Sequence, residues 1–215
     1  MRTIYQEQLQ NLQKELNLMY DLCAQAIALN KESLHNLYQK KPTKKTSKKQ
    51  SELLATSYKI LSKLTEKEKS ISESCELILL LQQPVAYDLG QITTTFRSVV
   101  DIKSIGELAQ NNIKTLAKIS KQYIPEALFT MAQVSCEMFA ILQKELKTQN
   151  HAKEKSYKED LYKKEKKLDL AFAQTQEHIA KKLSKTRQKA QVWLDVLIVA
   201  KQYEKIGDYI VHLGW

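Results

Sequence analysis

The chain has 215 residues, with four glycines, three prolines and a formal net charge of +10. So few turn-forming residues leave room only for long elements, and the many Leu, Ala, Glu, Gln and Lys residues favour helices. The most apolar stretches, residues 77–81 and 196–200, are too short to span a bilayer, and residues 1–10 lack the apolar run of a signal peptide. Composition therefore predicts an all-α, soluble, cytoplasmic protein.

Proline breaks helix interiors, so Pro42, Pro84 and Pro125 mark helix boundaries. The low-complexity stretch K-K-P-T-K-K-T-S-K-K, residues 40–49, is expected to form a Lys-rich loop. Polar clusters, such as residues 148–151, place the remaining boundaries. The pattern predicts six helices, over residues 3–38, 50–82, 85–121, 126–149, 152–186 and 188–213.

The two halves of the chain resemble each other. Apolar residues of the first half align in order with residues of the second: Met19, Leu22, Ile27, Ala28 and Leu29 with Met131, Val134, Phe139, Ala140 and Ile141. The sequence I-G-E at 105–107 likewise matches I-G-D at 206–208. An internal duplication explains both matches. We therefore predict two tandem antiparallel three-helix bundles, formed by residues 1–122 and 123–215.

The charges and cysteines restrict the binding partners. Much of the positive charge lies in residues 40–49, where no aromatic residues alternate with the lysines, so the pattern does not favour nucleic acid. A solubilising loop is the simplest interpretation, and binding to a polyanion is the alternative. Cys23, Cys75 and Cys136 have no C-x-x-C spacing, which predicts buried free thiols.

Four carboxylates on the last two helices are candidate metal ligands. Residues four apart share a helix face, so Glu165 stands with Asp169, and Glu204 with Asp208. Each pair borders the apolar stripe of its helix. If the two helices are adjacent and antiparallel, the four acids can converge, and oxygen ligands suit iron, manganese or magnesium. The alternative is an ordinary charged helix edge paired with lysines.

Gly207 and His212 lie beside these acids in the sequence. A glycine inside a helix costs roughly 0.5–1 kcal/mol relative to alanine. Gly207 is therefore expected to permit the close approach of a partner helix or of a ligand, and Gly106 is its counterpart in the first half. His212 continues the row of Glu204 and Asp208, and is a further ligand, a neighbour of the ligands or an exposed histidine.

One segment carries a family resemblance. C-E-L-I-L-L-L-Q-Q-P-V-A-Y-D-L, residues 75–89, is followed by D-I-K-S-I-G-E-L-A-Q-N-N-I, residues 101–113. Together with the start M-R-T-I-Y-Q-E-Q-L-Q-N-L and the late Y-E-K-I-G-D, this resembles the PhoU family, whose repeats carry Q-P-x-A-x-D-L-R and E-R-I-G-D-x-A-x-N-I segments. The resemblance covers nearly the whole chain outside the Lys-rich loop.

The resemblance implies a non-enzymatic regulator of phosphate uptake and phosphate signalling. Such a protein acts as an adaptor to the ATPase of the phosphate ABC transporter and to a sensor histidine kinase, and it reaches the membrane transiently through these partners. Whether the protein forms a homodimer is left open by the resemblance. The resemblance also implies metal binding through paired E(D)-x-x-x-D motifs, which carries over to Glu165, Asp169, Glu204 and Asp208.

The chain also departs from the family pattern. The positions of the first bundle that match the four acids are Leu61, Thr65, Lys103 and Glu107, so only the second bundle keeps a complete acidic set. Gly90 stands where the family has arginine, and His212 where it has asparagine. The second bundle also lacks a Q-P-x-A-x-D-L copy. These differences indicate a divergent member.

Two other functional classes remain open from the sequence. One is a metal-centred helical protein, for storage or hydrolysis, and the other is a helical module that binds polyanions through residues 40–49. The sequence contains no Ser/His/Asp arrangement, no Gly-rich phosphate loop and no H-E-x-x-H motif, so we expect no enzymatic activity.

Overall fold

The chain folds into six long helices. The computed structural model describes residues 2–38, 44–84, 86–148, 154–185 and 189–214. Its elements in chain order are α1 (Arg2–Tyr38), α2 (Lys44–Gln82), α3 (Ala86–Leu116), the short 3-10 helix η1 (Lys121–Tyr123), α4 (Glu126–Thr148), α5 (Glu154–Leu183) and α6 (Ala190–Leu213). These ranges contain no strand, so the all-α prediction is confirmed. No helix within them is both long and apolar enough to cross a bilayer.

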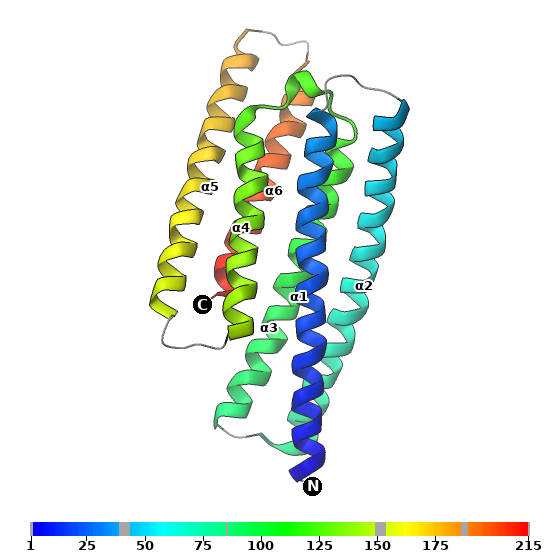
Figure 1. Ribbon diagram of the computed structural model, residues 1–215, viewed down its shortest axis with the longest axis vertical. Coiled ribbons are helices and arrows are strands. Elements are labelled where there is room, and N and C mark those ends of the chain that lie inside the picture. Colours follow the sequence, from blue (N-terminus) through cyan, green and yellow to red (C-terminus); the bar gives the residue numbers. More distant parts are fainter. Residues whose placement is uncertain (1, 39–43, 85, 149–153, 186–188, 215) are drawn as a thin grey trace.

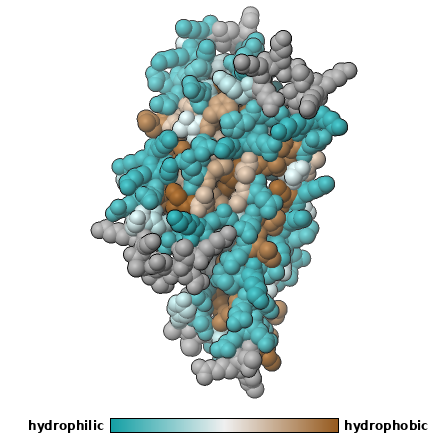
Figure 2. Space-filling model, viewed as in Figure 1, coloured by the Kyte–Doolittle hydropathy of each residue, from teal (hydrophilic) through white to brown (hydrophobic). Residues whose placement is uncertain are grey.

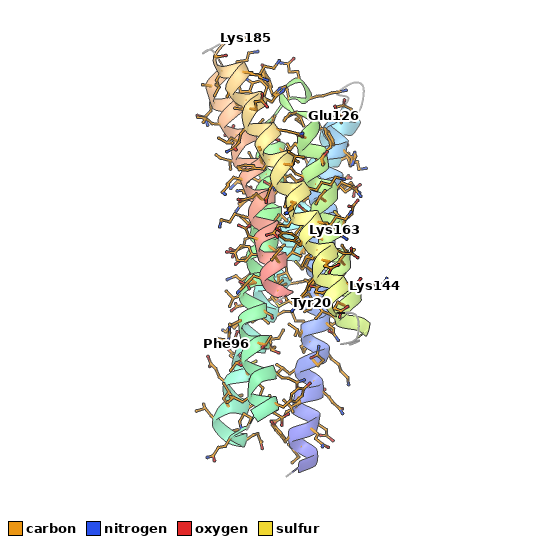
Figure 3. All side chains as sticks on the ribbon, turned by 90° about the vertical axis from the view of Figure 1, so that its left-hand side faces the viewer. Tyr20, Phe96, Glu126, Lys144, Lys163 and Lys185 are labelled. Atoms are coloured by element: carbon orange, nitrogen blue, oxygen red, sulfur yellow. The ribbon has the colours of Figure 1, made fainter. Side chains whose placement is uncertain are left out.

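The helices form two antiparallel three-helix bundles that lie side by side. Helices α1–α3 make the first unit and α4–α6 the second, as the repeat predicted (Figure 1). Between the units α1 packs against α4 and α3 against α6, whereas α2 and α5 lie on the outer sides. The first unit extends beyond the second at its lower end, where α1 begins and α2 meets α3 (Figures 1 and 3).

Both units share one apolar core. A single cluster of buried side chains runs through all six helices. At the interface between the units the rings of Tyr20 and Phe139 are 6.2 Å apart between centroids. The buried Tyr203 hydroxyl donates a 2.9 Å hydrogen bond to Oδ1 of Asn30. The predicted boundary after residue 122 falls inside η1, and independent domains on its two sides stay a prediction.

Helix α2 begins earlier than predicted. It starts at Lys44, so residues 44–49 are helical rather than part of a loop, while residues 40–43 lie outside the described residues. Lysine is a good helix former, and the side chain of Gln50 secures this end of the helix. Gln50 is buried, donates to Ser33 Oγ at 2.6 Å and accepts from Asn36 Nδ2 at 3.1 Å.

Helix α3 ends at Leu116, five residues before the predicted end. The amides of Lys118 and Ile119 donate to the carbonyl oxygens three residues earlier, at 3.0 Å each, which tightens the last turn. This turn buries Ile119 and directs the chain into η1. Burial of the Ile119 side chain stabilises the protein more than a further turn of α3 would. The apolar periodicity of the sequence does not reveal this difference.

Packing explains two of the three glycines that lie within helices. A β-carbon on Gly106 would collide with Cδ1 of Leu64 on α2, and one on Gly207 would collide with Cδ2 of Leu168 on α5. Each leucine is fully or almost fully buried. The same leucine-to-glycine contact therefore occurs once in each unit, and it allows the third helix of the unit to approach the second closely.

We predict that Gly207→Ala lowers the free energy of unfolding by about 1–2 kcal/mol, because overpacking against Leu168 outweighs the higher helix propensity of alanine. Thermal or urea unfolding measures the change. In a Leu168→Ala background the methyl group has space, so the same substitution should be neutral or stabilising there.

Gly90 provides the matched control. It lies inside α3, is exposed, and nothing lies within 4 Å of a β-carbon placed on it. Gly90→Ala should therefore raise the free energy of unfolding by about 0.5–1 kcal/mol. Equal effects of the two alanine substitutions would contradict the packing account of Gly207.

Candidate functional site

The four candidate acids surround the leucine-to-glycine contact of the second unit. Glu165 and Asp169 flank Leu168 on α5, and Asp208 follows Gly207 on α6. The α5 and α6 backbones therefore approach each other at the level of these carboxylates. Leu168 fills the space that the sequence left open to a partner helix or a ligand.

The acids influence one another across the two helices. Partial burial raises the pKa of Glu165 above its usual range, and the negative charges of Asp169 and Asp208 raise it further. Burial, followed by the charge of Glu204, likewise raises the pKa of Asp208, although Lys205 and Lys201 oppose this shift. The charges of Asp169 and Asp208 therefore act on Glu165, while the convergence of all four acids stays a prediction.

Lysines of α6 neutralise part of this charge. Lys201 Nζ lies 2.7 Å from both carboxylate oxygens of Glu204, and Lys205 Nζ lies 3.6 Å from Asp208 Oδ2. The Glu204 side chain is 19% exposed and the Asp208 side chain 50% exposed. Both pairs lie within one helix, three residues apart, so they leave the acids of α5 without a paired lysine of α6.

The described side chains do not form a metal cluster. Within that part of the chain, no three His, Cys, Asp or Glu residues are arranged to hold a metal ion. The donor types nevertheless suit a hard cation, and such a cation would relieve the repulsion that raises the pKa of Glu165. Metal binding by Glu165, Asp169, Glu204 and Asp208 stays a prediction.

His212 turns toward the first unit instead of the acids of α5. Its Nδ1 lies 2.6 Å from Oδ2 of Asp101 on α3. The carboxylate is largely buried, with 14% of the Asp101 side chain exposed, while the imidazole is 63% exposed. This pair joins the end of α6 to the middle of α3, and so ties the two units together.

The corresponding surface of the first unit is not acidic. Lys103 and Glu107 form an ion pair of 3.7 Å along α3. On α2 the hydroxyl of Thr65 donates to the carbonyl of Leu61. These contacts are those of an ordinary helix surface, in agreement with a site confined to the second unit.

The lower end of the first unit exposes a group of large apolar side chains. We call this the α2–α3 tip. It consists of Leu77, Leu80, Leu81, Tyr87 and Leu89. Leu80, Leu81 and Tyr87 are 75%, 69% and 74% exposed. Brown side chains reach this end between teal ones in Figure 2. Scattered exposed leucines are common, but a group of this size indicates an interaction surface.

Sequence reasoning missed this surface, although a signal was present. A run of apolar residues as long as 77–81 covers every side of a helix, so it cannot be buried by one neighbour. Gln83 follows the end of α2 and has a φ of 47°, a left-handed conformation that interrupts the helix before Pro84.

The cysteines are free, as predicted. Cys23 and Cys75 are buried and Cys136 is half-buried. Burial raises the pKa of Cys75 to about 11, and burial raises the pKa of Cys23 as well. Neutral thiols of this kind act as small apolar side chains.

Solved structures share this arrangement of helices. The crystal structure of PhoU from Pseudomonas aeruginosa matches with a TM-score of 0.76 and 17% identity, covering 98% of this chain and 95% of that one. The phosphate transport system regulatory protein PhoU from Streptococcus pneumoniae matches with a TM-score of 0.79 and 18% identity, covering 98% and 93%. At these identities the likeness shows the fold.

Sequence comparison finds the same similarity. The model of the PhoU domain matches residues 128–214. A phosphate-specific transport system accessory protein PhoU homolog from Rhizobium meliloti (strain 1021) is 21% identical over 164 residues, which are 75% of this chain and 69% of the relative. The chain is thus similar to PhoU proteins, and its second unit matches the PhoU domain.

A second PhoU relative matches over a somewhat shorter stretch. The phosphate-specific transport system accessory protein PhoU homolog 1 from Methanothermobacter thermautotrophicus is 25% identical over 146 residues, which are 64% of this chain and 63% of the relative. The PhoU domain match falls on the second unit, which keeps the four acids, while the first unit carries the Q-Q-P-V-A-Y-D-L motif at the α2–α3 tip.

We predict that Glu165→Gln stabilises the metal-free protein at neutral pH. The pKa of Glu165 is raised in the folded state, so its contribution to stability is present below the unfolded pKa and is lost as pH rises through the folded pKa. Removing the charge should add up to about 0.5 kcal/mol to the free energy of unfolding at pH 7. The difference should vanish below about pH 4.

The stability of Glu165→Gln in the presence of manganese is a second measurement. If the four acids bind the ion, manganese stabilises the original protein more than the variant, and the sign of the difference reverses. Glu159→Gln on α5, an exposed acid outside the group, is the control. A lower stability of Glu165→Gln at pH 7 without metal would contradict the repulsion described above.

Proposed function

We propose that this PhoU-like protein is a non-enzymatic regulator of phosphate uptake and phosphate signalling. It acts as an adaptor that docks on the ATPase of the phosphate ABC transporter and on a sensor histidine kinase. The similarity to PhoU proteins supports the regulatory role, and the relatives' names as phosphate-specific transport system accessory proteins support the link to phosphate transport. The α2–α3 tip is the observation that carries the adaptor role.

The tip has the properties of a protein-docking surface. Its apolar residues project from the end of two helices that the second unit does not cover (Figure 1). Tyr87 and Leu89 of the tip belong to the segment that carries the family motif, residues 82–89. Since exposed leucine and tyrosine side chains lose water on association, they supply the buried centre of an interface.

The charges beside the tip indicate the character of the partner. Asp88 accepts a 2.9 Å hydrogen bond from the Tyr5 hydroxyl, which holds its carboxylate at the start of α3. The exposed Glu76 directly precedes Leu77 near the end of α2. A complementary surface on the ATPase would therefore be apolar with basic residues at its margin.

The acids of α5 and α6 support a second part of this proposal. Their mutual repulsion favours the uptake of iron, manganese or magnesium, which would change the charge of the second unit. The bound ion would supply positive charge and no reaction step. The effect of manganese on Glu165→Gln tests this part separately from docking.

We predict that the triple substitution of Leu80, Leu81 and Tyr87 by serine weakens binding to the purified ATPase by at least about 30-fold, because it removes the apolar centre of the interface. Calorimetric or optical titration of the ATPase measures the affinity. The three side chains are mostly exposed, so the fold should be retained, and circular dichroism checks this.

The control variant replaces two leucines and one tyrosine of the second unit by serine. Leu170, Leu194 and Tyr162 are 61%, 46% and 53% exposed on the second unit, and their triple serine variant should bind as the original protein does. Unchanged binding by the tip variant, or equal losses in both variants, would contradict docking through the α2–α3 tip.

A further inference from the structure

The upper end of the molecule in Figure 1 is strongly basic. Lysines lie at the described start of α2, in the turn after α3, at the end of α5 and just before α6. We call this region the basic end. Its described lysines are Lys48, Lys49, Lys118, Lys121, Lys181, Lys182, Lys185 and Lys189. Figure 3 labels Lys185 at the extreme of the molecule, and the same end is predominantly teal in Figure 2.

Three acids pair with described lysines of this end. Glu52 pairs with Lys48 at 4.0 Å, Glu32 with Lys49 at 2.9 Å and Glu177 with Lys181 at 2.6 Å. Lys118, Lys182 and Lys185 are exposed, and no acid in the described parts of the chain lies within ion-pair distance of them. The opposite end carries charges of both signs: Glu76 and Asp88 lie there, and Glu73 pairs with Lys69 at 3.9 Å.

The basic end also contains a hollow whose lining mixes apolar side chains, such as Leu37 and Leu54, with polar ones. It has a volume of about 420 Å³ and lies between the start of α2 and the turn that follows α3. Lys118 and Lys121 stand at this hollow, together with the side chains of Ser47, Ser51 and Ser120. Ammonium and hydroxyl groups in this combination donate hydrogen bonds to the oxygens of a phosphate ester.

The aromatic side chains of this end argue against single-stranded nucleic acid. Lys121 Nζ lies 4.3 Å from the centre of the Tyr38 ring, and the same ring meets Phe129 edge-on. Lys189 Nζ lies 5.1 Å from the centre of the Tyr123 ring, which also packs edge-on against Trp193. With both tyrosine rings engaged in these contacts, neither offers an open platform for stacking a base.

We propose that the basic end binds directly to the anionic phospholipid surface of a membrane, so that the long axis of the molecule stands on the bilayer. The lysines of the basic end contact a plane together, while a headgroup phosphate occupies the hollow beside Lys118. Lysine clusters bind anionic bilayers through this additive attraction. The α2–α3 tip then points away from the lipid.

Vesicle co-sedimentation tests this proposal without any transporter protein, so its outcome is independent of the docking described above. The original protein should bind phosphatidylcholine vesicles that contain phosphatidylglycerol, should not bind pure phosphatidylcholine, and should dissociate as salt increases. Replacing Lys118, Lys182 and Lys185 by glutamine should weaken binding about fivefold for each lysine, or roughly a hundredfold in total.

The matched control replaces three exposed lysines away from the basic end, Lys14, Lys63 and Lys167, by glutamine. This control has the same net charge as the test variant. Its affinity for the anionic vesicles should fall by less than about twofold, because electrostatic attraction to the membrane surface is screened beyond about 10 Å. Failure of the original protein to bind the anionic vesicles, or equal losses in both variants, would overturn the proposal. Tighter binding to a DNA duplex than to the vesicles would overturn the lipid assignment.

Discussion

Burial of the facing apolar sides of α1, α3, α4 and α6 is the constraint on which the rest of the structure depends. On α3, Ile102 and Ile105 are fully buried, and Ile206 and Ile210 are fully buried on α6. A side chain of this kind contributes about 1.5–3 kcal/mol when it leaves water. Because these residues belong to one continuous cluster, each unit completes the core of the other. The outer helices α2 and α5 are then fixed by the leucine-to-glycine contacts at Gly106 and Gly207.

This packing also determines the chemistry of the surface. The contact of Leu168 with Gly207 brings α5 and α6 together, and the acids beside that contact repel one another as a consequence. In the first unit the same contact, between Leu64 and Gly106, lies beside residues that are mostly not acidic. The duplicated backbone feature is therefore structural in both units, and the charged group around it is a separate feature that only the second unit has.

The sequence predicted the helices and their division into two sets. Apolar periodicity and proline positions are local patterns, so they can be recognised without knowledge of tertiary contacts. The spacing on each helix placed Glu165 and Asp208 beside the apolar stripes, but their convergence on a metal stays a prediction. The sequence did not predict the helical conformation of residues 44–49, which depends on the contacts of the buried Gln50 with Ser33 and Asn36. The pair of Asp101 and His212 joins different units, so it could not be obtained without the tertiary structure. The apolar run 77–81 was a signal for exposed side chains, whereas the position of Leu80 at the end of the first unit depends on the lengths of the units.

One shared core makes the molecule a single rod that holds the α2–α3 tip and the basic end at opposite extremes, which is what an adaptor requires. Differential scanning calorimetry of the whole chain tests this claim most directly. The account predicts a single transition, with a calorimetric enthalpy equal to the van't Hoff enthalpy. Two separate transitions, one for each three-helix unit, would show that the units fold independently and would contradict the account.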